Sequence, residues 1–359
     1  MSEPLRNNCV IVLGMHRAGT SALTRVINLL GVDLGHDFLE PTADNPAGYW
    51  EHRVIYHIHE RMLNALGRTW HTLFPFPQNW WKDETIDPYR KQIVRALQQD
   101  FSGSALWGIK DPRMCRLMPL WIDVLQELES DPYFIIMFRH PEEVAKSLAE
   151  RDGFSQDKCL LLWLIHFIES ERETRGYPRV FVSFDSLMED SRTETVRISE
   201  TLGLEWPISI EDASDSISAH LQPALRHHRT ASSAMAAESQ YGEAAAELFE
   251  AMNAASSSEG GALSEVLTHI EGRLGEAPLA SNRQLLIEDF KALQSRLAET
   301  DSWVKSREED LAQCQHDLHR YRSQVEDIAA RLECVLNSRS WKMTAPLRHL
   351  HDLFSRPAK

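Results

Sequence analysis

This sequence is organised around the stretch Val10-Ile-Val-Leu-Gly-Met-His-Arg-Ala-Gly-Thr-Ser-Ala-Leu23. Its first four residues are apolar and predict a buried strand over 10–13. Gly14 ends that strand, and Gly19 lets the backbone approach a ligand closely. Thr20 and Ser21 then open a helix. A strand, a glycine-bounded turn and a helix start predict a cradle for an anion, because free backbone N–H groups and the helix dipole both point at it.

Three interpretations of this loop compete. The first is an ordinary strand-to-helix turn without a ligand. The second is a nucleoside triphosphatase loop, and the third is a loop whose cation comes earlier, at Arg17. The second fits the spacing of Gly14 and Gly19, but Thr20 stands where that loop needs lysine. The third resembles the 5′-phosphosulfate loop of sulfotransferases that use 3′-phosphoadenosine 5′-phosphosulfate. That resemblance implies a set of cofactor-binding residues: His16, Arg17, Ala18, Gly19, Thr20 and Ser21.

Composition narrows the class of protein. The net charge of −15 over 359 residues argues against general nucleic-acid binding. The five cysteines are scattered without a C-x-x-C pair, which predicts neither a disulfide framework nor a zinc site, and we expect no metal. The first residues lack signal-peptide features, and no apolar run approaches the roughly 20 residues of a membrane span. We therefore expect a cytoplasmic protein.

Strands alternate with helices through the first part of the chain. Further strands are expected at 105–109, 133–138 and 179–183, each short and largely apolar. Strands that alternate with helices imply a parallel sheet with right-handed crossovers. The fold class is therefore α/β, a P-loop-like three-layer domain with a central parallel sheet over residues 1–229.

A second motif follows the third expected strand. Arg139 and Ser147 lie eight residues apart across a strand end and a helix, where a guanidinium fork and a hydroxyl can hold a phosphate. This spacing also resembles the sulfotransferases, where such a pair binds the 3′-phosphate of the nucleotide. The resemblance further implies that Phe184 lies near the adenine, in place of a tyrosine. Arg226 and Arg229 are the candidates for a late cationic loop that otherwise has no clear equivalent.

The resemblance also implies a catalytic set. Glu51 matches a glutamate that takes the proton of an acceptor hydroxyl, and Lys110 matches a basic residue beside the transferring group. Glu51 has a simpler interpretation as a carboxylate near a helix start, and His52 is the rival base because it titrates near neutrality. Arg17 completes the set by neutralising the 5′-phosphate. We expect transfer of a sulfuryl group to a hydroxyl acceptor.

The pattern changes beyond the first domain. Residues 230–280 are rich in Ala, Ser, Glu and Gly and predict a linker or marginal helices. Over 281–336 apolar residues recur every seven positions, from Phe290 to Leu332, which predicts a coiled coil. A helix with one apolar stripe must bury it. Self-association through 283–336 is the expected result, and folding back on the chain's own domain is the alternative.

Residues 337–359 form a basic amphipathic tail that includes Asn337-Ser-Arg-Ser-Trp-Lys-Met-Thr-Ala-Pro-Leu-Arg348. It resembles a tail that follows coiled coils in bacterial glycosyltransferases of surface polysaccharides. The resemblance implies a glycan acceptor, handled near the inner face of the membrane, and the tail is a candidate for contact with that surface. A simple end cap is the alternative. Two other classes stay open for the whole chain: a P-loop kinase or nucleoside triphosphatase without the usual lysine, and a non-enzymatic coiled-coil scaffold.

Overall fold

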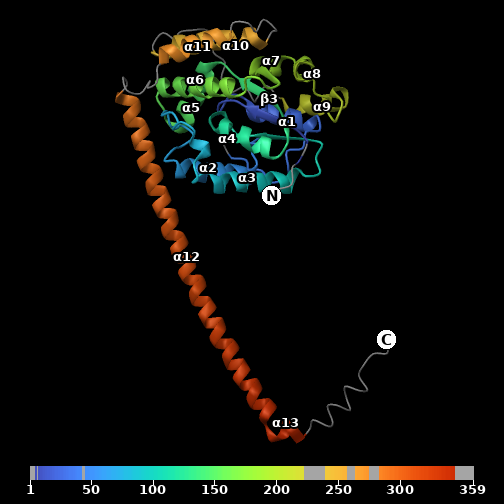
Figure 1. The fold of residues 1–359 in the computed structure, drawn as a ribbon, viewed down its shortest axis with the longest axis vertical. Coiled ribbons are helices and arrows are strands. Elements are labelled where there is room, and N and C mark those ends of the chain that lie inside the picture. Colours follow the sequence, from blue (N-terminus) through green and yellow to red (C-terminus); the bar gives the residue numbers. More distant parts are fainter. Residues whose placement is uncertain are drawn as a thin grey trace. The chain divides into compact units, whose positions relative to one another are not determined.

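A computed structural model describes residue 5 and residues 7–42, 45–221, 239–256, 263–274 and 283–343. The chain forms two structural units, Met1–Leu293 and Gln294–Lys359. The first unit holds the sheet and the helices around it, and the second holds most of one long helix (Figure 1). Among the described residues, no helix is both long and apolar enough to cross a membrane.

Four parallel strands form the sheet of the first unit, and this confirms the predicted α/β class. They are β1 (Asn8–Leu13), β2 (Leu106–Lys110), β3 (Asp131–Phe138) and β4 (Arg179–Ser183). Their spatial order is β2-β1-β3-β4, so the first strand is central. In register, Val10 of β1 lies opposite Gly108 of β2 and Tyr133 of β3.

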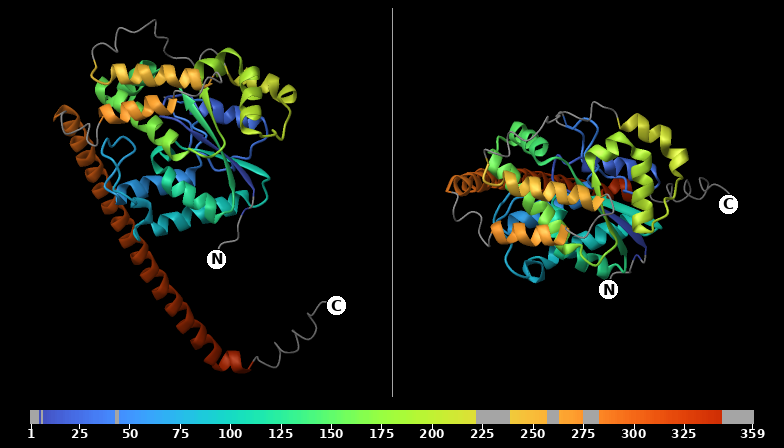
Figure 2. Two further views of the ribbon diagram at one scale, coloured as in Figure 1. Left: turned by 45° about the horizontal axis from the view of Figure 1, so that its top comes forward. Right: turned by 90° about the horizontal axis from the view of Figure 1, so that it is seen from above.

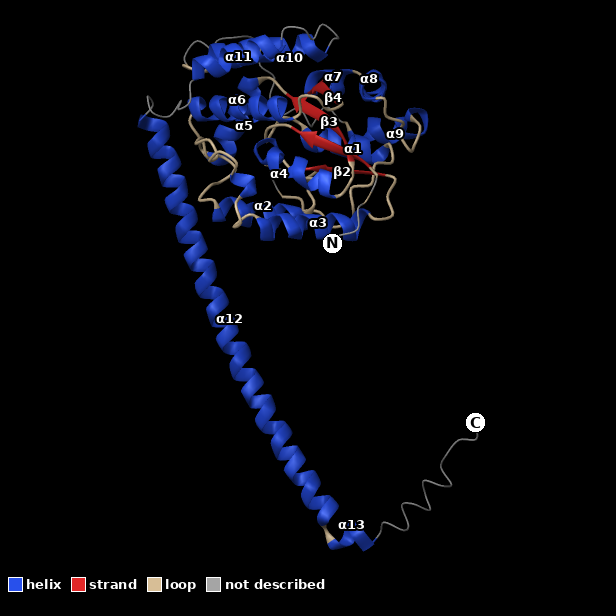
Figure 3. Ribbon diagram, viewed as in Figure 1, coloured by secondary structure: helices blue, strands red, loops and turns tan. Residues whose placement is uncertain are grey.

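Helices cover both faces of the sheet, because successive strand residues point to opposite faces and both faces are apolar. On one face, Val10 and Val12 pack with α1 (Thr20–Leu29) and α8 (Ser191–Leu202). On the other, Ile11 and Leu13 belong to a larger core with helices that include α2 (Arg53–Ala65), α3 (Asp87–Phe101), α4 (Met114–Glu127), α5 (Pro141–Asp152) and α6 (Gln156–Glu173). The strands lie between these helices in Figure 3.

Two short helices complete the covering. α7 (Phe184–Glu189) begins directly after β4 and contacts α8. α9 (Ile210–His220) begins after Ser209, whose hydroxyl accepts a hydrogen bond from the backbone N–H of Asp212. It buries Ala213 and Ile217 against α1. A 3₁₀ turn, η1 (Trp80–Lys82), lies in the aromatic stretch before α3. Trp80 of this turn is buried in the core.

The segment expected to be a linker or marginal helices contains two helices that belong to the core. They are α10 (Gly242–Ser256) and α11 (Leu263–Leu274). Leu248 and Met252 of α10 and Leu267 of α11 are buried in the larger core, and α10 contacts α6 and β4. The two orange helices remain beside the green α6 in both further views (Figure 2). The domain therefore does not end at residue 229, because alanine-rich helices still present an apolar face that the sheet's helices cover.

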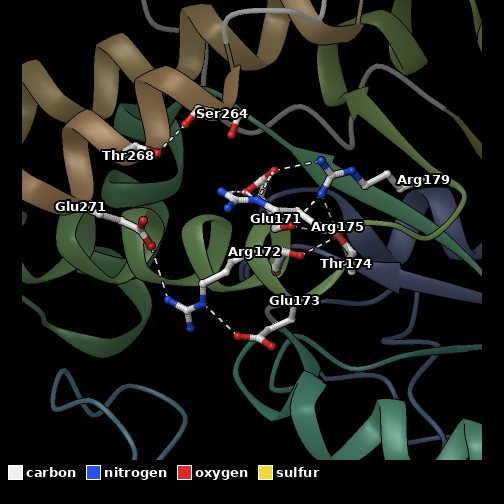
Figure 4. A network of polar contacts seen from close by, with 10 residues as sticks. Glu171, Arg172, Glu173, Thr174, Arg175, Arg179, Ser264, Thr268 and Glu271 are labelled. Carbon is white, nitrogen blue, oxygen red and sulfur yellow. Dashed lines mark hydrogen bonds and ion pairs between the residues drawn. The ribbon is translucent and has the colours of Figure 1, made fainter.

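Ion pairs tie α11 to its neighbours (Figure 4). Arg172 of α6 contacts Glu173 at 2.9 Å and Glu271 of α11 at 3.4 Å. On the same helix, Glu171 is buried and pairs with Arg175 and Arg179. Glu171 and Arg172 lie on the C-terminal part of α6, so the end of that helix links α11 to the start of β4.

We expect Leu248→Ala to lower the free energy of unfolding by about 2–5 kcal/mol, because it leaves a cavity in a packed core. The matched control is Glu250→Ala on the exposed face of α10, which should change stability by less than about 0.5 kcal/mol. Urea unfolding followed by circular dichroism measures both. An equal, small effect of the two changes would mean that α10 is not part of the cooperative core.

One uninterrupted helix, α12 (Arg283–Asn337), occupies the segment where the heptad pattern lies, and a short α13 (Arg339–Met343) follows it. Leu285 at its start is buried in the larger core, and Ser155 donates a hydrogen bond to Glu288 at 2.9 Å. The first turns of α12 thus belong to the first unit. The tail beyond Met343 lies outside the described residues.

Candidate active site

The predicted site residues gather at the carboxyl ends of the four strands. The anion cradle, residues 14–21, follows β1, Lys110 ends β2, Arg139 follows β3 and Phe184 follows β4. In an open parallel sheet, this edge is where ligands bind. A cavity of about 110 Å³ lies here, and its lining includes most of the predicted residues: His16, Arg17, Gly19, Thr20, Ser21, Glu51, Lys110, Arg139 and Phe184.

Two glycines of the anion cradle have no room for a side chain. A Cβ on Gly14 would lie 2.4 Å from the carbonyl oxygen of Met137, on the neighbouring strand β3. A Cβ on Gly19 would lie 2.3 Å from the ring of Phe184. Gly19 has φ of 91° and is the residue before α1, so the helix N-terminus opens onto the cavity. The backbone N–H of Gly14 donates to the Cys115 sulfur at 3.1 Å, which anchors the loop.

Arg17 adopts a backbone conformation that is rare for a residue with a side chain. Its φ is 68°, in the left-handed region, where non-glycine residues carry about 1–3 kcal/mol of strain. Its Nε donates to the Ser147 hydroxyl at 2.7 Å. Arg17 and Ser147 are 130 residues apart, so the fold joins the two motifs that the sequence analysis singled out. Strain held at a cation that lines a cavity points to ligand binding rather than to packing.

Arg139 is buried and held by three neighbours. Its Nε donates to Glu143 at 2.8 Å, its guanidinium lies 4.7 Å from the centre of the Phe184 ring, and its carbonyl accepts from Trp163. The structure thus brings Arg139 and Ser147 to one edge of the sheet but gives each a protein partner. Glu143, on the first turn of α5, was not predicted. Its contact with Arg139 depends on how the chain turns from strand to helix between them, and the sequence does not show that turn's geometry.

Glu51 and Lys110 form a buried ion pair beside the helix start. Lys110 Nζ lies 2.8 Å from Glu51 Oε1 and 3.3 Å from the Ser21 hydroxyl. Burial raises the pKa of Glu51, while the positive charge of Lys110 opposes that rise. The carboxyl of Glu51 is therefore a stronger base than an exposed glutamate. Its other oxygen is 3.8 Å from Arg113.

Asp111 and Arg113 pair with each other. Arg113 contacts Asp111 at 2.9 Å and Glu60 at 2.6 Å. Burial alone would raise the pKa of Asp111, but the charge of Arg113 and a hydrogen bond from His59 hold it well below its usual range. Asp111 thus stays ionised and orients Arg113 beneath Glu51.

His52 does not reach the cavity. Its Nε2 lies 2.6 Å from Asp100 and its Nδ1 accepts from the backbone N–H of Ile55, so the ring caps α2. A residue at a helix N-cap turns back toward its own first turn. Of these two adjacent residues, Glu51 lines the cavity, whereas His52 is directed toward Asp100.

His16 stands where two cavities meet. A second cavity of about 500 Å³ adjoins the first, and its lining shares His16, Tyr49, Glu51 and Arg151 with it. The His16 ring packs on Trp70 with centroids 4.2 Å apart, and its Nε2 is buried without a hydrogen-bond partner in the described part of the chain. Burial lowers the pKa of His16, so its imidazole is neutral near pH 7.

The remaining predicted residues divide into two groups. Ala18 is buried in the core beneath the loop and is not among the residues that line the cavity. Arg226 and Arg229 lie outside the described residues. Sequence reasoning missed Tyr49 and Arg151, which line both cavities. The short spacing between Tyr49 and Glu51 was a usable signal, whereas nothing local marks Arg151 at the end of α5.

No protein-family model matches the chain, and no curated protein matches it. Several solved structures are similar to it, and two of them are sulfotransferase domains. A sulfotransferase domain from the Synechococcus PCC 7002 olefin synthase is 18% identical, with 70% of this chain and 96% of that domain covered and a TM-score of 0.38. A sulfotransferase domain from the curacin biosynthetic pathway is 12% identical, with 70% and 99% covered and a TM-score of 0.38.

Proposed function

We propose that this protein is a sulfotransferase that uses 3′-phosphoadenosine 5′-phosphosulfate and a hydroxyl acceptor. The observation that carries the proposal is that two cations, Arg17 and Lys110, meet with their partners at the helix start. Arg17 contacts Ser147, and the buried Glu51–Lys110 pair lies against Ser21. Cations and backbone N–H groups at that point favour a transferring group with spread negative charge.

In the proposed reaction, each residue has one task. Arg17 and the N–H groups of the anion cradle hold the 5′-phosphate and the bridging oxygen. Glu51 removes the proton of the acceptor hydroxyl while that oxygen bonds to sulfur. The bond from sulfur to the bridging oxygen breaks, and 3′-phosphoadenosine 5′-phosphate leaves. Lys110 keeps Glu51 ionised before the reaction and neutralises charge near the transferring group.

The acceptor occupies the second cavity in this proposal, because Glu51 lines both cavities. The first cavity, at about 110 Å³, suits the charged end of the nucleotide rather than the whole molecule, since pockets for drug-sized ligands are typically about 300–1,000 Å³. The resemblance of the tail to those of polysaccharide glycosyltransferases favours a glycan hydroxyl, presented near a membrane surface. Vesicle co-sedimentation of full-length protein and a glycan acceptor screen test these two parts.

Isothermal titration separates the proposal from its rival, a P-loop kinase or nucleoside triphosphatase. The contact between the Lys110 ammonium and the Ser21 hydroxyl favours the rival, because a loop lysine would make a similar contact. A sulfotransferase binds adenosine 3′,5′-bisphosphate without magnesium, whereas the rival needs ATP with magnesium. Binding of neither nucleotide would leave the scaffold interpretation.

We expect Arg139→Ala to weaken the binding of adenosine 3′,5′-bisphosphate more than it slows the bound reaction. The 3′-phosphate lies away from the reacting sulfur, so its contacts stabilise ground state and transition state equally. The matched ligand control is adenosine 5′-phosphate, whose affinity should change little. An unchanged affinity for the bisphosphate would contradict the assignment of this site.

A further inference from the structure

The long helix α12 carries an apolar stripe that runs along its exposed surface. With Phe290 as position a of a heptad, the a positions are Phe290, Leu297, Val304, Leu311, Leu318, Val325 and Leu332. The d positions, starting at Leu293, include Thr300, Arg307, Cys314, Tyr321, Ile328 and Val335. Apolar residues of this stripe are between 42% and 65% exposed. Leaving so many large apolar side chains in water is unfavourable, so the stripe requires a partner.

We propose that α12 pairs with α12 of a second copy of this chain as a parallel, in-register, two-stranded coiled coil. This inference is independent of the proposed function, because it rests on the heptad pattern of one helix. It commits to a direction and a number of strands.

Charge complementarity favours the parallel direction. In a parallel pair, position g of one helix faces position e of the next heptad on the other, five residues further along. Asp317 then faces Arg322, and the pair 296/301 likewise joins an arginine to an aspartate. No g–e pair from 289/294 to 331/336 joins like charges.

The polar positions of the seam favour the same arrangement. A parallel register places each d residue opposite its own copy, so Thr300 meets Thr300 and Arg307 meets Arg307. The two like charges at position 307 then need carboxylates beside them. An antiparallel pair places d residues against a residues, which are all apolar here, and burying a charge against them is costly. Arg307 already contacts Asp310 at 3.1 Å within its helix, and Glu308 at the adjacent e position adds a second carboxylate.

Two strands fit better than a larger bundle. Leucine at a with Ile328 and Val335 at d favours larger bundles near the end of the helix. Arg307 opposes this, because a larger bundle encloses the d position more completely, whereas in a pair its long side chain reaches solvent. A charged group that must be desolvated outweighs a modest packing preference, so we assign two strands.

Two exposed cysteines test the register directly. Cys314 is at d, in the seam, and Cys334 is at c, on the outer face; the other three cysteines are buried. The full-length protein is oxidised with copper-phenanthroline, which takes two electrons from two thiols to form a disulfide. We expect Cys334→Ser, which keeps Cys314, to form a covalent dimer. We expect Cys314→Ser, which keeps Cys334, to form at least about tenfold less covalent dimer.

Light scattering on the full chain with a matched pair of variants tests the seam itself. We expect wild type and Ala312→Glu, at the exposed b position, to have twice the mass of one chain, and Leu311→Glu, at a, to have the mass of one. A dimer without a Cys314 cross-link would overturn the parallel register. A threefold or higher mass would overturn the number of strands, and a monomeric wild type would overturn the interface.

Discussion

Replacing Arg17 by alanine should lower turnover by about 100- to 1,000-fold while the fold survives, since removal of one preorganised donor to a developing charge has an effect of that size. Arg17 follows a strand, lines the cavity and holds Ser147, so its loss removes a ligand for the transferring group rather than core packing. The backbone strain at φ 68° stays in the alanine variant, so stability should change little. Sulfuryl transfer to a small soluble phenol or sugar, with a thermal melt of each variant, measures both quantities.

The matched control for Arg17 is Arg25→Ala on α1. Arg25 lies over the Trp50 ring at 4.7 Å and donates to Asn28, so it is a cation on the helix that follows the Arg17 loop, and it has partners of its own. Its removal should leave turnover within about twofold of wild type, because surface changes of this kind are nearly neutral. A folded Arg17→Ala protein with wild-type turnover would show that the loop does not bind the transferring group.

Replacing Glu51 by glutamine should lower kcat by about 100- to 10,000-fold, because it removes the general base without changing shape. Burial raises the pKa of Glu51, and the base works only when ionised. The wild-type rate should therefore fall as the pH drops through that raised pKa, above the range of an exposed carboxylate. In the glutamine variant, this acidic limb should disappear and the residual rate should be flat. Profiles of kcat/KM against pH, recorded for both proteins, measure this acidic limb.

Two control variants accompany Glu51→Gln. Glu40→Gln changes an exposed carboxylate that lines the same second cavity and should keep the acidic limb. His52→Asn keeps a side chain that can cap α2 but removes the contact with Asp100, so it should lower the melting temperature without moving that limb. Persistence of the wild-type limb in Glu51→Gln, or its loss in His52→Asn, would assign the base to another residue.

Most of the strands and helices that could be predicted follow from patterns among residues that are close together in the sequence. The strand over 10–13, the helix that starts at Thr20 and the strand before Arg139 follow from local apolar runs and turn residues, and all three are present. The heptad of α12 was equally visible, because its period needs no knowledge of the rest of the fold. The helix of residues 242–256 was obscured, since alanine and glutamate mark a marginal helix unless a core is known to cover it.

The sequence by itself determined that a strand, a glycine-bounded loop with Arg17 and a helix start follow one another, and that a long helix lies further along the chain. These are local properties, fixed by apolar periodicity and by glycine's freedom to adopt positive φ. Only the tertiary structure decided the contacts across the site. Lys110 reaches Glu51 over 59 residues and Arg17 reaches Ser147 over 130, because the order β2-β1-β3-β4 sets three strand ends side by side. It also turned His52 toward Asp100 and Glu51 toward the cavity. Two adjacent residues thus received different roles from packing that no local pattern records.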